Sequence, residues 1–424
     1  MILGEEYRWN LPVITYGFDG EFLAYFGEEG VAAVERAIAI LSNLPPVSEI
    51  NLDDYDTRSV LVNQDAVALG LLDVKSVTLQ WLMYQLGLAQ ASRYVWTIRE
   101  RTNESTNVVQ RNYNPATLLP SDLVNDIRYG YQIIAFADGS ADAIETLDPL
   151  ATFAFSAVTD AHLSAGRFLV GLTRDDGGGL RYLYSRTNIN IETFPGSMEA
   201  TARPGIEEFN FVKMSWDTNG QRFNSVTSSF DITFVTNGLT QTQHVQRVVT
   251  TPDILFEMRD LGGFRERGPA GEYYFLLRLT EGSDTAHWQN LSSMNAGTDG
   301  PGIIVPGARL TFNKLGKYAG LGGLSSYQWG SFDETSNPPV IFTGNERAQT
   351  VTLDNYLEKE GTNSYFTSVL LGTVGAVYQV DSSTNLSDWT PFTTVTNENW
   401  MYGHFSFRDE VRDSRKFYRA VRRD

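Results

Sequence analysis

Short β-favouring runs separated by Gly, Asn and Asp recur along most of this chain, and they restrict its fold more than any other feature. Few segments between residues 130 and 350 have helical periodicity. We therefore predict an α+β fold that is mostly β. The expected strands include 127–136, 180–184, 230–235, 245–249 and 273–279. Gly177–Gly179 follow two aspartates and predict the tip of a hairpin.

The length of 424 residues is too great for one ordinary core and suits two or three domains. The order of patterns predicts a small α/β part over residues 1–125 and a β-rich middle over 126–345. Residues 346–424 contain six short β runs of their own and predict a C-terminal β-sandwich.

The N-terminal part opens with a strand, in which Val13, Thr15 and Gly17 alternate with the larger residues Ile14, Tyr16 and Phe18. An aromatic stretch at 22–26 comes next. Glu28 and Glu29 mark a helix N-terminus, because negative charge is favoured there. Apolar residues at helical spacing follow, and Pro45–Pro46 ends that helix.

A second helix is predicted over 74–88, with Asp73 as its N-cap and Gly87 at its end. The plain interpretation is a core helix, since glycine is the usual residue just past a helix terminus. The second interpretation is the skeleton of a metal-binding helix. Two ligands one turn apart and a third beyond a glycine turn would fall on Gln80, Tyr84 and Gln90, with Trp81 at the position of a general base.

With the preceding strand and helix, this stretch resembles the scaffold of the matrixin-type metzincin proteases. There, an I-x-Y-x-F strand precedes a helix containing A-x-x-x-A-I and then the H-E-x-x-H-x-x-G-x-x-H helix. Here Ile14, Tyr16 and Phe18 match the strand, and the run Ala33–Ile40 matches the first helix. Every ligand position differs, so the resemblance implies a metzincin-like domain that has lost its zinc chemistry.

A second resemblance covers about 45 C-terminal residues. Tyr378 to Thr390 reads YQVDSSTNLSDWT, and the chain closes on a run containing Phe417-Tyr418-Arg419-Ala420. This is similar to the C-terminal module of many secreted verrucomicrobial and planctomycete proteins. The whole chain also resembles secreted proteins of such bacteria. The resemblance implies an extracellular or cell-surface setting.

Composition narrows the classes of partner and chemistry. A net charge of −18 disfavours nucleic acid and anionic membranes as partners. There is no cysteine, no apolar run long enough to span a bilayer, and no signal-peptide pattern at the start. The four histidines have no metal-ligand spacing, and no serine-nucleophile motif is present. No cofactor is expected; calcium is possible at Asp217 and Asn219, although such stretches are usually turns. A glycosidase would need only two carboxylates and stays open.

We therefore expect a secreted, non-catalytic structural protein whose main partner is itself, as a filament, sheath or layer subunit. Tyr7 and Trp9 in the segment Glu5–Asn10 would form an arm that adds to a neighbour's sheet. Deleting residues 1–10 should then abolish assembly and leave a folded monomer. The alternative is a monomeric peptide- or glycan-binding protein that uses the former protease cleft, which would be open and polar beside Gln80, Tyr84 and Gln90.

Overall fold

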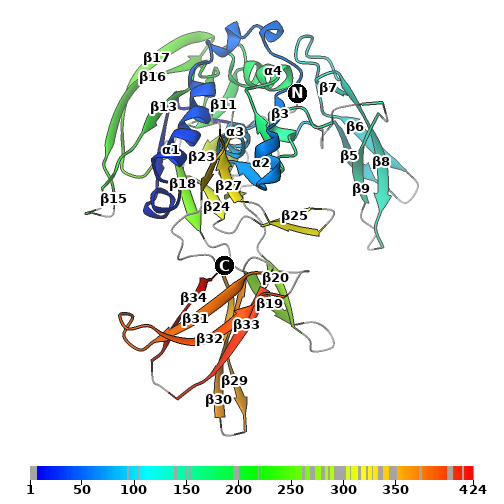
Figure 1. The fold of residues 1–424 in the computed structure, drawn as a ribbon. Helices are drawn as coiled ribbons and strands as arrows, with labels where there is room; N and C mark the ends of the chain where they lie inside the picture. The colour runs from blue at the N-terminus through cyan, green and yellow to red at the C-terminus, as the bar shows by residue number, and fades with distance from the viewer. Residues whose placement is uncertain are drawn as a thin grey trace.

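The computed structural model has the predicted α+β, mostly β fold (Figure 1). It describes residues 7–92, 95–102, 105–137, 141–148, 150–151, 154–193, 200–217, 219–220, 222–259, 263–267, 273–277, 282–284, 287–290, 302–305, 307–313, 317–320, 323–326, 328–332, 338–342, 351–361, 363–371, 375–398, 404–412 and 415–423. The α-helices within these residues are α1 (Gly20–Ser42), α2 (Gln64–Ala68), α3 (Val74–Gln85) and α4 (Arg174–Tyr184). None of the described helices is long and apolar enough to cross a membrane.

A five-stranded sheet forms the centre of the larger body, in the order β13-β2-β18-β24-β21. β13, β2, β18 and β24 run parallel, and β21 is antiparallel to β24. These strands are β2 (Val13–Phe18), β13 (Asn210–Lys213), β18 (Ile254–Arg259), β21 (Gly282–Asp284) and β24 (Ala308–Asn313). This sheet crosses the boundary expected after residue 125. Strand β2 lies before that boundary, and its two partners, β13 and β18, both lie after it.

The predicted alternation of β2 decides how the layers pack. Ile14, Tyr16 and Phe18 enter the main core, where α1 and α3 lie against the sheet and each other. On the opposite face Val13 packs with Phe230 of a second sheet. That sheet has the order β11-β12-β16-β17. Its strands are β11 (Asn190–Thr193), β12 (Ala200–Arg203), β16 (Val226–Thr236) and β17 (Leu239–Val249).

Helix α1 begins earlier than predicted, at Gly20, where the Asp19 side chain accepts a hydrogen bond from the backbone N of Phe22. Its φ/ψ angles break at Gly27, so a second helical segment starts at Glu28, at the predicted position. Phe22 and Phe26 are therefore helical, and both rings pack against Phe312 of β24.

Helix α4 replaces the hairpin expected at Gly177–Gly179 and the strand expected at 180–184; both predictions are wrong. Thr173 and Asp176 form a reciprocal capping box that starts the helix. The glycines serve close packing: a Cβ on Gly178 would lie 2.1 Å from Pro115 Cβ, and one on Gly179 would lie 2.7 Å from Leu88 Cδ2. Glycine is therefore needed at 178 and 179 because Pro115 and Leu88 of the same chain leave no room for a side chain.

Smaller sheets surround this body. β27 (Gln328–Ser331) joins β28 (Val340–Phe342) and β4 (Leu71–Asp73), and β3 (Val60–Val62) pairs with β10 (Arg167–Leu169). β1 (Tyr7–Arg8), β23 (Gly302–Val305) and β22 (His287–Asn290) form another sheet. Two-stranded pairs are β14 (Trp216–Asp217) with β15 (Arg222–Phe223), β19 (Gly263–Arg267) with β20 (Tyr273–Leu277), and β25 (Lys317–Gly320) with β26 (Gly323–Ser326).

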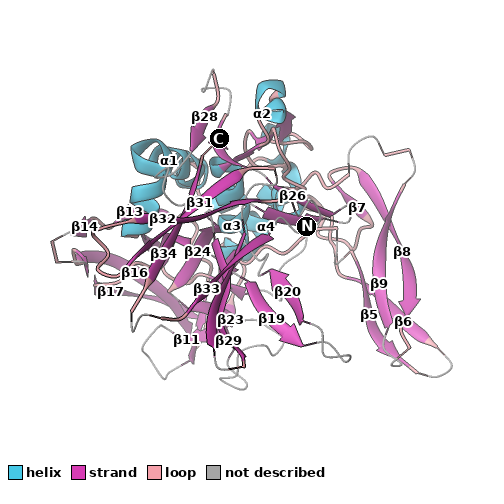
Figure 2. Ribbon diagram, turned by 60° about the horizontal axis from the view of Figure 1, so that its bottom comes forward, coloured by secondary structure: helices cyan, strands magenta, loops and turns pink. Residues whose placement is uncertain are grey.

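A set of strands stands off the larger body in both views, and we call it the β-wing (Figures 1 and 2). It consists of β5 (Trp96–Arg101), β6 (Thr106–Gln110), β8 (Ile127–Ala135) and β9 (Ala141–Leu147). β7 (Leu123–Val124) pairs with the first two residues of β8.

The C-terminal residues form two three-stranded sheets around a core of their own. Tyr378 and Val380 from one sheet pack with Phe405 and Phe407 from the other. One sheet contains β29 (Val351–Glu360), β30 (Asn363–Leu371) and β33 (His404–Glu410); the other contains β31 (Val377–Ser383), β32 (Thr390–Thr396) and β34 (Phe417–Arg422). Trp389 is not one of these core residues. The Cζ atom of Arg419 lies over the Trp389 ring, 4.5 Å from the ring centroid.

Candidate functional site

Helix α3 is fixed at both ends as its sequence predicts. The buried Asp73 carboxylate accepts hydrogen bonds from the N and Oγ of Ser76, and burial raises its pKa. At the other end, the N–H of Gly87 bonds to Tyr84 O and that of Leu88 to Met83 O, the pattern of a Schellman motif. Gly87 has φ +87°, and a Cβ there would lie 2.0 Å from Tyr7 O.

Gln80, Tyr84 and Gln90, the three positions that the resemblance predicts as altered ligand positions, lie close together, and their contacts are with the chain's own backbone or with one another. Gln80 Nε2 donates to Val158 O at 3.0 Å and to Ala161 O at 2.8 Å. The Tyr84 hydroxyl donates to Thr159 O and accepts from Gln90 Nε2 at 3.3 Å. The 3₁₀ turn Val158–Asp160 therefore lies against the face of α3 that carries Gln80 and Tyr84.

Trp81 lies apart from this polar cluster, in the core. It is 7% exposed, and its ring centroid is 4.9 Å from that of Phe312. An indole cannot accept a proton from water, and amide and phenol groups committed to peptide carbonyls do not make a zinc site. The donor set therefore does not fit zinc, and α3 has the contacts of a structural helix.

Two buried carboxylates hold the 158–161 segment in place, one from α4 and one within the segment itself. Asp176 Oδ2 accepts hydrogen bonds from the N–H of Val158 and of Thr173, each at 3.0 Å, and Asp160 Oδ2 accepts from Ser92 N at 2.8 Å. Burial raises the pKa of Asp176 to about 6, although its hydrogen bonds act in the opposite direction. Burial also raises the pKa of Tyr84 to about 12.

The other candidate metal positions have structural contacts. Asp217 Oδ1 accepts from Asn219 N at 3.0 Å, which makes a turn between β14 and β15. His244 Nδ1 lies 2.8 Å from Asp231 Oδ1 on the surface, and the His162 ring stacks on Phe155. Within the described residues, no three His, Asp or Glu side chains are grouped to hold a metal ion.

The expected arm is not exposed. Tyr7 and Trp9 are 2% and 0% exposed and belong to the main core. The Trp9 Nε1–H donates to Gln85 O at 2.6 Å, and β1 pairs with β23 of the same chain. Glu5 and Glu6 lie outside the described residues. Size explains this position, because two large aromatic side chains bury more apolar surface in a core than in an exposed arm.

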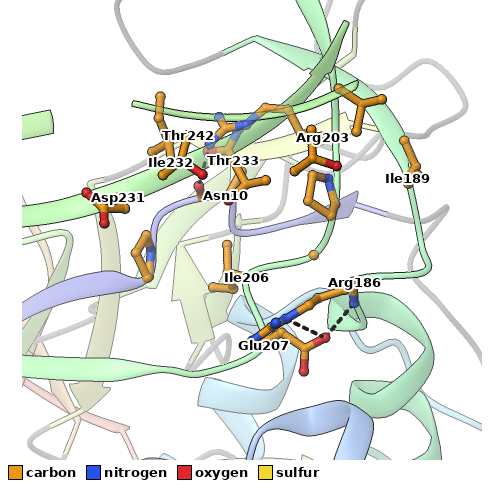
Figure 3. A pocket seen from close by; sticks show the side chains of 15 residues that line it. Asn10, Arg186, Ile189, Arg203, Ile206, Glu207, Asp231, Ile232, Thr233 and Thr242 are labelled. Atoms are coloured by element: carbon orange, nitrogen blue, oxygen red, sulfur yellow. Dashed lines mark hydrogen bonds and ion pairs between the residues drawn. The ribbon is translucent and has the colours of Figure 1, made fainter. Parts of the chain in front are cut away.

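Sequence reasoning missed a cavity of about 570 Å³ between the β16–β17 sheet and the segment Arg203–Glu207 (Figure 3). Thr233, Thr240 and Thr242 lie on its sheet side. Arg186, Glu207 and Asp231 supply charged groups, and the apolar lining comes from Pro12, Ile189, Pro204, Ile206, Ile232 and Val235. The lining residues are scattered from position 10 to position 242, so no local sequence motif identifies them.

The cavity wall formed by residues 203–207 has a strained backbone that hydrogen bonds and close packing hold in place. Glu207 has φ +66°, which is unfavourable for any residue with a side chain. Its buried carboxylate accepts from Arg186 N at 2.6 Å and from Ser48 Oγ at 2.7 Å. A Cβ on Gly205 would lie 2.0 Å from Tyr184 O. The wall therefore has little freedom to collapse into the cavity.

Buried ionic groups on the side away from the cavity also hold this wall, through the backbone of Arg203. Arg8 is 0% exposed; its Nε lies 2.7 Å from Glu192 Oε1, and its Nη2 donates to Arg203 O at 2.9 Å. Desolvation raises the pKa of Glu192 and lowers the pKa of Arg203. These bonds join the N-terminal strand to β11 and β12, about 180 residues away in sequence.

Comparison with known proteins gives no further guide. No family model, no curated protein and no solved structure matches this chain. The two resemblances noted in the sequence thus stay predictions, and function must be argued from the geometry alone.

Proposed function

We propose that this protein is a non-catalytic structural protein of the cell surface that polymerises by edge-to-edge pairing of its strands. The observation that supports this is a pair of uncovered strand edges, β8 and β17, on opposite sides of the molecule (Figures 1 and 2). An unpaired edge presents backbone N–H and C=O groups that another chain can bind.

The β8 edge is apolar as well as unpaired. β7 covers only Ile127 and Arg128, and no other described strand pairs with that side of β8. Side chains beyond that point are exposed on both faces, which is unusual for a strand of a monomeric protein. They are Tyr131, Ile133, Ile134 and Phe136, between 37% and 49% exposed.

The β17 edge is long and nearly uncharged. Its eleven residues end the β11-β12-β16-β17 sheet, and those from Leu239 to His244 are exposed. Arg247 is the one Lys, Arg, Asp or Glu residue in β17, and its guanidinium is paired with Asp253 at 2.6 Å. Natural edges are usually protected by lysine, proline or a bulge, and β17 contains no lysine, proline or bulge.

A second copy of this chain is the partner that these edges suit. Two copies with a charge of −18 each repel, so a contact is favourable only where negative charge is absent. The stretch 129–137 of the wing has no charged residue. Because the two edges lie on opposite sides, pairing at both gives an open chain of subunits.

The test is sedimentation and negative-stain electron microscopy of wild type and edge variants over a range of protein concentrations. Wild type should form filaments, and added salt should promote them because it screens the repulsion. Ile133→Lys with Ile134→Lys should block the β8 edge, and Val248→Lys should block the β17 edge. Leu386→Lys, at an exposed leucine of the C-terminal module that lies outside any strand, is the matched control and should assemble normally.

The variants also distinguish two modes of assembly. If β8 pairs with β17, either variant stays monomeric. If each edge pairs with its own copy, each variant stops at a dimer. A wild-type protein that stays monomeric at high concentration and high salt would refute the proposal.

The alternative of peptide or glycan binding beside α3 has less support. Gln80, Tyr84 and Gln90 already make hydrogen bonds with the 158–161 backbone or with one another. No contact among the described residues favours an external ligand at that position.

A further inference from the structure

The cavity beside Arg203–Glu207 has the size and lining of a ligand site; it is separate from the β8 edge and from α3, and β17 contributes Thr240 and Thr242 to its lining. Its volume of about 570 Å³ is within the usual range for small-molecule sites. The strained Glu207 and the closely packed Gly205 hold one wall in place, so the cavity exists before a ligand arrives.

Opposite charges stand at two sides of this cavity (Figure 3). The Arg186 side chain is 77% exposed, and its Nε forms an ion pair with Glu207 Oε1 at 3.7 Å, which is longer than a hydrogen bond. The pair involves Nε alone, so the two Nη groups have no partner among the described residues. Asp231 is 63% exposed on the other side, where one of its oxygens bonds to His244.

Between the charges lie hydroxyl groups and aliphatic side chains. Thr233, Thr240 and Thr242 can each donate and accept a hydrogen bond, which suits amide groups. Ile189 and Ile206 offer aliphatic surface. Among the described residues, no aromatic ring lines the cavity, and these residues offer no stacking surface for a sugar ring or a nucleobase.

We infer that this cavity binds a short peptide with free termini and an aliphatic side chain. Arg186 takes the carboxylate, Asp231 takes the ammonium group, and the threonines hydrogen-bond the peptide amides. The aliphatic side chain packs on Ile189 and Ile206. This site goes beyond the structural role and does not depend on it.

The test is isothermal titration of the full chain with aliphatic dipeptides in three forms: free, N-acetylated and C-amidated. The free dipeptides should bind, and either block should weaken binding about tenfold or more, the usual effect of losing a charged hydrogen bond. Arg186→Ala should weaken the free dipeptide to a similar extent without affecting the C-amidated form. Asp231→Asn should weaken the free dipeptide in the same way without affecting the N-acetylated form.

Arg128→Ala is the matched control, because Arg128 is 65% exposed and lies in the β-wing. It should bind every dipeptide as wild type does. All variants change exposed side chains, and an unchanged thermal melt verifies that each is folded. Absence of binding by folded wild type, or equal binding of the three dipeptide forms, would overturn the inference.

Discussion

Single residues in this protein are often set by a close approach that only the folded chain creates. Gly87 is predicted from its place at a helix end, and its φ of +87° agrees with that reason. The structure adds a second reason, the Tyr7 carbonyl 2.0 Å from where a Cβ would lie. Because Tyr7 is eighty residues away, no local pattern could have predicted this contact.

Gly87→Ala should therefore destabilise the protein by roughly 2–4 kcal/mol, from left-handed strain together with displacement of the N-terminal strand. The matched control is Gly361→Ala, where φ is +61° and no atom lies within 4 Å of the added methyl group. That variant should lose only about 1 kcal/mol. Urea unfolding measures both, and equal losses would mean that the Tyr7 contact is unimportant.

The raised pKa of Asp176 predicts how the stability of the protein depends on pH. Its pKa is about 6 in the folded state, whereas an unperturbed aspartate has a pKa of 3.8, so folding favours the protonated carboxyl. Below pH 3.8 this stabilisation is fully present, and it is lost as the pH rises through about 6. The loss amounts to at most about 3 kcal/mol.

Urea unfolding of wild type and Asp176→Asn across this pH range isolates the effect as the difference between the two curves. The asparagine cannot ionise, so the variant should lack this part of the pH dependence, whatever its absolute stability. Asp53→Asn is the control, since the Asp53 side chain is 85% exposed, and it should retain the wild-type curve. A variant curve parallel to that of wild type would contradict the burial argument.

At the scale of elements, sequence patterns predict those whose cause is local. The alternation in β2 and the caps of α3 are predictable because each depends on neighbours in sequence. Helix α4 escapes prediction because three successive glycines disfavour a helix, and two of them, Gly178 and Gly179, are required by contact with Pro115 and Leu88. The polar side chains of α3 bond to the 158–161 segment, which lies some eighty residues away and which no local pattern identifies.

Helix α4 offers a test of this explanation within one turn. A methyl group on Gly177 would come no closer than 3.6 Å to any atom, so Gly177→Ala should stabilise the protein by up to about 1 kcal/mol through helix propensity. Gly178→Ala places the methyl group 2.1 Å from Pro115 Cβ and should destabilise by about 1–3 kcal/mol. Opposite signs in thermal melts support the packing account; a gain from both would show that the glycines are not needed.

At the scale of the whole molecule, the main core joins segments from both sides of the boundary expected after residue 125. Trp9, Ile14 and Trp81 pack in the same core as Phe256 and Phe312. A deletion of residues 1–10 would remove Tyr7, Arg8 and Trp9 from this core, so it should unfold the larger body. The burial of these residues thus argues against the expectation that such a deletion leaves a folded monomer.

The same observation predicts how fragments of the chain behave. Residues 1–125 alone leave β2 without β13 and β18 and expose the side chains that meet Phe256 and Phe312, so this fragment should not fold. Residues 346–424 keep both of their sheets and a separate core, so this fragment should fold alone. Near-ultraviolet circular dichroism and cooperative thermal melting decide both cases, with residues 1–345 as the control that restores the sheet. A cooperative melt from residues 1–125 would reinstate that boundary and the self-contained α/β domain it implies.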